Sequence, residues 1–153
     1  MNRFGLTFHH LGLAVPSTAE AVQFLDRLGY RQGPAVFDPL QKVNLSMCWH
    51  DTMPDLELVW PGDEPSPIDR MLKRGGPLVY HLCYATADAA ASLAGMAAEG
   101  IEVLELAPPQ PAVLFGGRAV SFHSIGGFGL IELIHDDGAV QPSPSSFELA
   151  MEA

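Results

Sequence analysis

The sequence predicts an α+β fold built from two tandem modules, because the chain repeats one pattern in each half. His10–Val15 and His81–Thr86 are both short, strand-like runs that begin with a histidine. Each run is followed by a helical stretch that ends at a glycine, Gly29 in the first half and Gly100 in the second. The two histidines and the two glycines are each separated by 71 residues, which indicates an internal duplication.

A glutamate inside an apolar strand is the second repeated feature. Leu56–Val59 contains Glu57, and Ile131–Ile134 contains Glu132, 75 residues later. An ionised carboxylate among buried strand residues is strongly unfavourable unless a cation or hydrogen-bond donors compensate it. We therefore expect both glutamates to have a partner.

Three helices are predicted from their terminal residues. Ser17–Glu20 has the pattern of a capping box and predicts a helix over 17–28. Asp88 is the expected N-cap of the Ala-rich second helix, which has the highest helix propensity in the chain. Ser66–Asp69 carries a cap, a proline and an acid, and predicts a short linker helix over 66–74 between the halves.

The remaining strands complete each module. Val43–Trp49 and Ala119–His123 are short and rich in strand formers, so each half is predicted as a strand, a helix and then about three strands. The predicted organisation is one domain, 1–153, with modules 8–62 and 78–136, the linker helix 66–74 and a loose tail 138–153. We expect no catalytic residue in the tail.

Composition narrows the classes of partner. Asp and Glu total 18 against 8 for Lys and Arg, and the formal charge of −10 disfavours nucleic acid and membrane surfaces. The sequence contains no apolar run near the roughly 18 residues of a membrane span and no secretory signal pattern, so a cytoplasmic protein is expected. Cys48 and Cys83 are expected to be free, buried thiols.

Two histidines and two glutamates at repeat-equivalent positions predict a metal site. If a pseudo-twofold axis relates the halves, His10, Glu57, His81 and Glu132 converge on it. Two imidazoles and two carboxylates suit one divalent ion such as Zn, Ni, Co, Fe or Mn, with water completing an octahedron. His9 competes with His10, but the repeat offset favours His10.

Other polar residues give weaker signals. Gly117 and Arg118 form a flexible turn beside a guanidinium, which either binds a substrate carboxylate or phosphate or is an ordinary hairpin with an exposed arginine. His50, His123 and His135 have no partner at the repeat spacing, so we expect them to be solvated or hydrogen-bonded.

The chain resembles the vicinal oxygen chelate superfamily over about residues 8–136. This superfamily contains glyoxalase I, methylmalonyl-CoA epimerase, extradiol dioxygenases and bleomycin-type resistance proteins, and the resemblance is greatest to the epimerase branch. The residues that carry it are His10–Val15, Leu56–Val59 with Pro61, Ser66–Asp69 leading through Gly75 and Gly76 to His81, and Gly117–Phe122 leading to Leu130–Leu133.

The resemblance implies two βαβββ modules that form a curved mixed sheet around a central metal cup. It places the metal ligands on His10, Glu57, His81 and Glu132. This set of residue types matches bacterial glyoxalase I. The epimerases usually have Gln at the position of Glu57.

The second catalytic base of the epimerases has no counterpart in this sequence. The epimerases use a further glutamate on the strand after the first helix, and this chain has Asn44 or Leu45 there, with Asp38 in a nearby loop as the alternative carboxylate.

The implied activity is that of a metal-dependent isomerase or epimerase that stabilises the enolate of a small acyl thioester or 2-oxo compound. Glu132 is the expected base, with Glu57 as second choice, and an acyl-CoA is a candidate substrate. Two alternatives remain: a glyoxalase I-type lyase acting on a glutathione hemithioacetal, and a non-catalytic binding or resistance protein. Relatives commonly pair, so a homodimer is expected.

Overall fold

The computed structural model describes residues 2–136, which form one mixed sheet of nine strands with three α-helices. The elements are β1 (Thr7–Ala14), α1 (Ala19–Leu28), β2 (Arg31–Gln32), β3 (Val36–Asp38), β4 (Val43–Trp49), β5 (Leu56–Pro61), α2 (Ile68–Gly75), β6 (Leu78–Thr86), α3 (Ala89–Ala98), β7 (Val103–Pro111), the 3-10 turn η1 (Val113–Phe115), β8 (Ala119–Ile125) and β9 (Gly129–His135). The prediction of an α+β fold with a curved mixed sheet is confirmed. The predicted tail, 138–153, lies outside the described residues.

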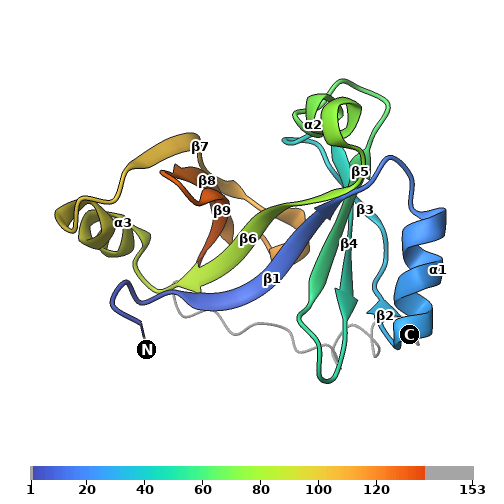
Figure 1. Ribbon diagram of the computed structural model, residues 1–153, viewed down its shortest axis with the longest axis horizontal. Helices are drawn as coiled ribbons and strands as arrows, with labels where there is room; N and C mark the ends of the chain where they lie inside the picture. Colours follow the sequence, from blue (N-terminus) through green and yellow to red (C-terminus); the bar gives the residue numbers. More distant parts are fainter. Residues whose placement is uncertain (1, 137–153) are drawn as a thin grey trace.

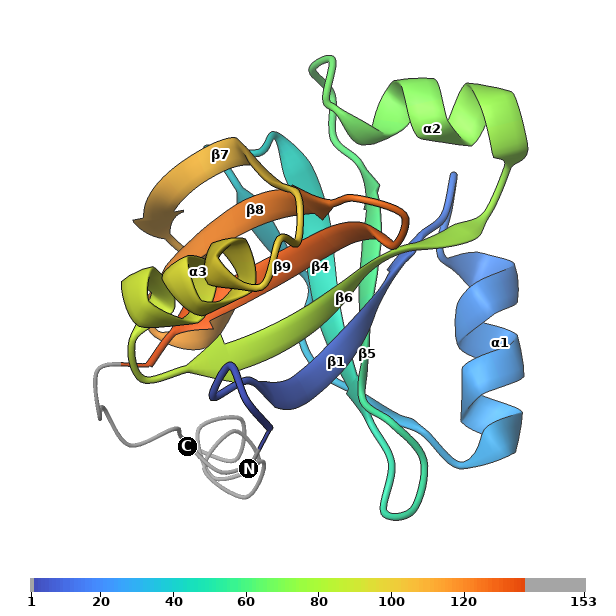
Figure 2. The ribbon, with the colours of Figure 1, turned by 60° about the vertical axis from the view of Figure 1, so that its left-hand side comes forward.

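The two halves meet at the centre of the sheet. The strand order is β2-β4-β5-β1-β6-β9-β8-β7, with β3 paired to β4, and β1 runs antiparallel to β6 (Figure 1). In each half the first strand has a parallel neighbour that carries the repeated glutamate, β5 beside β1 and β9 beside β6. The four strands β5, β1, β6 and β9 therefore lie side by side, as Figure 2 shows.

The helices follow the alternation of side chains along the strands. Leu58 and Leu133 point to the convex face of the sheet, where α1 packs against the first half and α3 against the second. Glu57 and Glu132, one residue away, point to the concave face. The linker helix α2 packs at one end of that face, with Ile68 buried in an apolar cluster.

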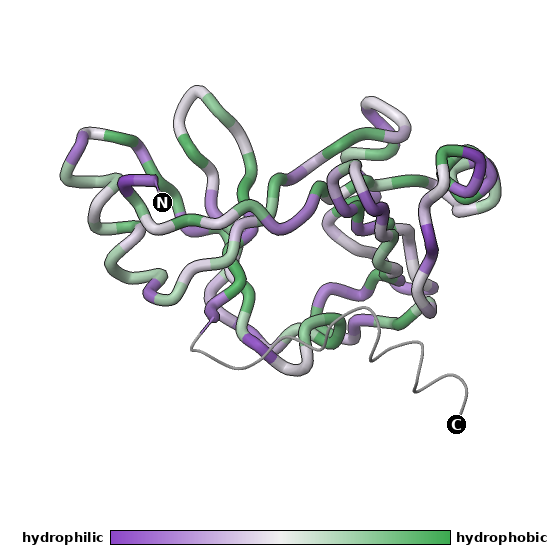
Figure 3. The backbone as a smooth tube through the Cα atoms, turned by 90° about the horizontal axis from the view of Figure 1, so that it is seen from below, coloured by the Kyte–Doolittle hydropathy of each residue, from purple (hydrophilic) through white to green (hydrophobic). Residues whose placement is uncertain are grey.

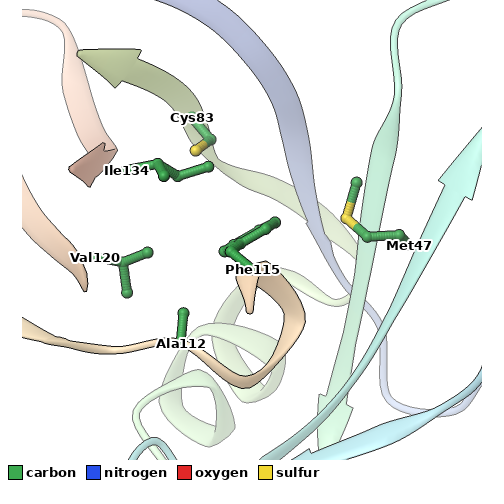
Figure 4. Close-up of a cluster of buried hydrophobic side chains, with 6 residues drawn as sticks. All are labelled: Met47, Cys83, Ala112, Phe115, Val120 and Ile134. Atoms are coloured by element: carbon green, nitrogen blue, oxygen red, sulfur yellow. The ribbon is translucent and has the colours of Figure 1, made fainter. Parts of the chain in front are cut away.

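The concave face is partly filled by the chain itself. Seen from below, the backbone of the two halves curves around a central space (Figure 3). Figure 4 shows Phe115, from η1, reaching into this space toward Met47 of β4, with Cys83 of β6 and Ile134 of β9 on the opposite side. Phe115 is buried, so η1 closes one side of the concave face.

Two helix starts differ from prediction and one agrees. α1 begins at Ala19 after Thr18, whose backbone is already helical (φ −92°, ψ −21°), and no side chain caps it. The capping box expected at Ser17 therefore does not form. Asp88 is extended and accepts a hydrogen bond from the Ala91 backbone N–H at 2.9 Å, as predicted for α3.

The linker helix begins two residues later than predicted. It spans Ile68–Gly75, and the Asp69 carboxylate accepts a hydrogen bond from the Ser66 backbone N–H at 2.8 Å. Ser66 thus receives the side-chain contact that it was expected to provide. Cys48 and Cys83 are free and buried, as predicted. No helix within residues 2–136 is long and apolar enough to cross a membrane.

Candidate metal centre

Two β-bulges at the middle of the sheet place the candidate histidines. Between β1 and β6, the register skips His9 on one strand and Tyr80 on the other. Each extra residue lies directly before a repeated histidine, His10 or His81, so the same distortion occurs at equivalent points of both halves. A bulge redirects neighbouring side chains to one face, and here it directs both members of each pair toward the concave side.

Gly12 provides the space for the second histidine. It lies opposite His81 in the sheet, and a Cβ at this position would come within 2.1 Å of His81 Nε2. Any side chain here would displace the imidazole, because real atoms do not approach so closely. The glycine of the His10–Val15 run is therefore part of the site.

The four predicted ligands converge. His10, Glu57, His81 and Glu132 each offer one atom, and these atoms all lie within 4.8 Å of one another. His10 Nε2 lies 2.7 Å from Glu57 Oε2 and 3.6 Å from Glu132 Oε1. His81 Nε2 lies 3.8 Å from Glu57 Oε2. All four residues are buried, with exposures of 0 to 4 %.

This donor set fits a divalent ion. Both ring nitrogens of His81 and Oε1 of Glu132 are buried and have no hydrogen-bond partner within the described chain. Buried polar atoms are rarely left unpaired, and two carboxylates in one apolar pocket repel each other. Imidazole and carboxylate groups in this arrangement are suitable ligands for Zn, Ni, Co, Fe or Mn.

The pKa shifts reflect the same crowding. Burial, followed by the Glu57 carboxylate, raises the pKa of Glu132 to about 8. Burial lowers the pKa of His81 to about 4. Burial alone would raise the pKa of Glu57, but the hydrogen bond and charge of His10 lower it. One carboxylate is thus held ionised and the other protonated near neutral pH.

His9 supports the site from outside. Its Nδ1 lies 2.8 Å from Nδ1 of His10, and Phe115 contacts the rings of both histidines. If His10 Nδ1 carries the proton and donates to His9, then His10 Nε2 is left as a free ligand atom facing Glu57. His9, His10 and Cys83 also form a close group of ligand-type atoms, but it shares His10 with the larger cluster.

The turn expected to bind substrate makes several contacts within the protein. Arg118 is largely buried, with 9 % of its side chain exposed, and its Nε donates to the Phe115 carbonyl at 3.3 Å. It also lies 3.7 Å from Asp136. Gly117 donates its backbone N–H to the Ala112 carbonyl and has a φ of +81°. Both residues therefore hold the β7–β8 connection, and neither is among the four converging residues.

The second-base positions contain no available carboxylate. Asn44 donates to the Pro61 carbonyl at 3.1 Å, and Leu45 belongs to an apolar cluster. Asp38 is buried, and its oxygens accept hydrogen bonds from the backbone of Leu40 and from the backbone and side chain of Gln41. Asp38 therefore stabilises its own turn.

A cleft of about 420 Å³ lies beside the cluster, between α2, β7 and β8. Tyr80 and Phe122 line it, and both rings stand edge-on to the His81 ring, with centroid distances of 4.5 and 5.6 Å. The sequence did not identify Tyr80 or Phe115 as site residues. Tyr80 directly precedes His81, as His9 precedes His10, and this repeated position is the sequence signal that could have identified Tyr80.

Comparisons with known proteins agree with the geometry. The family model of the glyoxalase/bleomycin resistance protein/dioxygenase superfamily matches residues 9–122. The fold is similar to methylmalonyl-CoA epimerase from Mycobacterium tuberculosis, with a TM-score of 0.72, 21% identity and coverage of 88% of this chain and 91% of that one.

A second similar structure is a variant of Streptomyces coelicolor methylmalonyl-CoA epimerase in complex with 2-nitronate-propionyl-CoA. Its TM-score is 0.66, its identity 26%, and the alignment covers 84% of this chain and 96% of that one. A methylmalonyl-CoA epimerase in complex with methylmalonyl-CoA and NH4+ gives a TM-score of 0.67, 25% identity and coverage of 89% and 97%. No curated protein sequence matches this chain.

Proposed function

Because the chain belongs to the glyoxalase/bleomycin resistance protein/dioxygenase superfamily, we propose that it is a metal-dependent isomerase or epimerase that forms an enolate from a small acyl thioester or 2-oxo compound. One observation carries the proposal: two histidines and two glutamates from equivalent strands bring four ligand atoms within 4.8 Å in a buried pocket. The epimerase-like fold of the similar structures supports an isomerase-type role in general.

In the proposed site, His10, Glu57, His81 and Glu132 would hold the ion. When bound, a divalent metal polarises the substrate carbonyl and stabilises negative charge on its oxygen. Glu57 lies against His10 at 2.7 Å and is suited to a permanent ligand role. The Phe115 ring stacks on His10 and shields this side from water.

Glu132 is the proposed base. Its Oε1 has no hydrogen-bond partner in the described structure, so this carboxylate oxygen is available to accept a proton. The carboxylate would take the proton from the carbon next to the carbonyl. The C–H electron pair would move into the carbon–carbon bond, and the carbonyl π pair onto oxygen, giving the enolate.

One feature distinguishes this site from a two-base epimerase site. The two available carboxylates are both members of the metal cluster, and the strand β4 offers Met47 opposite Glu57. A single base returns the proton to the face from which it came. We therefore expect deuterium from solvent to enter the substrate with retention of configuration, faster than epimerisation occurs.

A glyoxalase I-type lyase is the second candidate, because the His, Glu, His, Glu set matches the ligands that this activity uses in the resemblance described above. Proton transfer between adjacent carbons of a hemithioacetal needs the same enolate chemistry and a single carboxylate. Turnover of the glutathione hemithioacetal of methylglyoxal, compared with deuterium exchange on acyl thioesters, separates the two candidates.

The first experiment is elemental mass spectrometry of untagged protein, with His81→Ala and the control His50→Ala. About one equivalent of a divalent transition metal in the wild type and the control, lost in His81→Ala, is the expected result. Absence of bound metal after reconstitution would contradict both enzymatic candidates and favour a binding protein.

A further inference from the structure

The cleft beside His81 is lined almost entirely by apolar side chains. Of its fourteen lining residues, eleven are apolar, and the polar ones are Gln41, Tyr80 and Gln110. None of the lining residues, all within the described part of the chain, is an acid, a lysine, an arginine or a histidine. Ligand sites of this volume are commonly apolar, with few polar groups that fix orientation.

The cleft offers nothing to neutralise a negative charge. A carboxylate transferred into it would lose its hydration without gaining a cation or a set of N–H donors, which is strongly unfavourable. The formal charge of −10 on the whole chain adds long-range repulsion. Arg118, the guanidinium near the concave face, does not line the cleft and contacts Phe115 and Asp136.

Tyr80 is the polar group at the end of the cleft nearest the metal cluster. The β-bulge that places His81 also turns the Tyr80 side chain to the concave face. Its ring stands edge-on to His81 at 82°, and no hydrogen bond joins its hydroxyl to another residue between 2 and 136. Tyr80 is partly buried, so its hydroxyl is open to the cleft and can donate to a substrate oxygen placed between the cleft and the cluster.

Gln41 and Gln110 are less suited to this role. The Gln41 amide donates to the Asp38 carboxylate at 3.1 Å, and Gln110 lies on the exposed edge strand β7. The hydroxyl of Tyr80 is therefore the donor that combines a free hydrogen with proximity to His81.

We infer that this cleft binds an uncharged, apolar chain of the substrate and that the Tyr80 hydroxyl donates a hydrogen bond to a substrate oxygen. The inference rests on the proposed function for the identity of the reacting group. It narrows the substrate class to carbonyl compounds whose chain, beyond the enolisable carbon, has no carboxylate. Tyr80 is thereby a binding residue that orients the substrate.

Two thioesters with the same uncharged thiol part test which acyl chain the cleft accepts. Hexanoyl-N-acetylcysteamine and adipoyl-N-acetylcysteamine have acyl chains of equal length, and the second ends in a carboxylate. Titration into protein labelled at the methionine methyl groups with 13C reports binding at Met71, which lines the cleft, while Met96, a buried residue of α3, is the internal control. We expect the hexanoyl probe to shift the Met71 signal and to bind at least about tenfold more tightly than the adipoyl probe.

Tyr80→Phe tests the hydroxyl, with Tyr84→Phe as the matched control. Tyr84 packs in the apolar cluster under α3, on the opposite face of the sheet. Tyr80→Phe is expected to weaken binding of the hexanoyl probe by about threefold to tenfold while leaving metal content unchanged, and Tyr84→Phe to leave the affinity unchanged. Equal affinities for the two probes, an unmoved Met71 signal, or equal behaviour of the two variants would overturn the inference.

Deuterium exchange on the same probes separates this inference from the proposed function. Tight binding of the hexanoyl probe in the cleft without exchange at its α-carbon supports the cleft and contradicts enolisation. Exchange at equal rates in both probes supports enolisation and refutes the apolar specificity.

Discussion

Metal binding to this site should release a proton from Glu132. With a pKa of about 8, this carboxyl group is about nine-tenths protonated at pH 7 in the metal-free protein, and a metal ligand must be ionised. Binding at pH 7 then carries a penalty of about 1.4 kcal/mol, equivalent to tenfold in affinity, relative to a fully ionised site. The physical cause is burial of Glu132 beside the Glu57 carboxylate.

The assay is calorimetric titration of Zn2+ in buffers with different ionisation enthalpies. The wild type should release about 0.9 more protons per metal at pH 7 than Glu132→Gln, and the difference should fall to about 0.1 at pH 9. Burial lowers the pKa of His10, while Glu57 and, to a smaller extent, Glu132 raise it, so comparison with this variant retains most of the contribution of His10 in both proteins. Equal proton release by the two proteins at pH 7 would refute the reasoning.

Three further predictions concern stability. In the metal-free protein the raised pKa of Glu132 means that folding stability is lost as pH rises from about 4.5 through about 8. Glu132→Gln should flatten this pH dependence and raise the free energy of unfolding at pH 7 by roughly 3 kcal/mol, measured by urea unfolding. Gly12→Ala places a Cβ within 2.1 Å of the His81 imidazole, so it should abolish metal binding and lower the free energy of unfolding by about 1–3 kcal/mol. The control Gly75→Ala meets no atom within 4 Å and should change neither the metal content nor the free energy of unfolding. Asp88→Ala should cost about 1 kcal/mol through loss of a helix cap, while Ser17→Ala should change the unfolding free energy by less than about 0.5 kcal/mol; an equal loss in both variants would contradict the assignment of caps.

The candidate ligands could be predicted because each ligand type occurs twice, at matching positions of the two repeated modules. A single histidine or glutamate in a strand says little, but His10 with His81 and Glu57 with Glu132 fall at matching points of two similar modules. Strand alternation then places each pair on one face. These four side chains lie together in the structure, so the repeat alone was sufficient to predict this cluster.

Other parts of the site depend on contacts between distant segments. Tyr80 faces the cleft because β6 bulges against β1, and a bulge is a property of the pair of strands. Phe115 fills the concave face because η1 folds back over it, which local propensity does not encode. Arg118 was expected either to bind a substrate anion or to be an exposed hairpin residue, but in the structure its Nε donates to the carbonyl of Phe115 and its guanidinium lies 3.7 Å from the carboxylate of Asp136.

The paired bulges also give the site a handedness. A duplicated scaffold presents two equivalent flanks to a molecule bound on its axis, and a planar species there would meet the same groups on either side. This chain places an imidazole, His9, at the bulge of one flank and a phenol, Tyr80, at the bulge of the other. The backbone retains its approximate twofold relation while the side chains break it, so the two faces of a flat intermediate become chemically distinct.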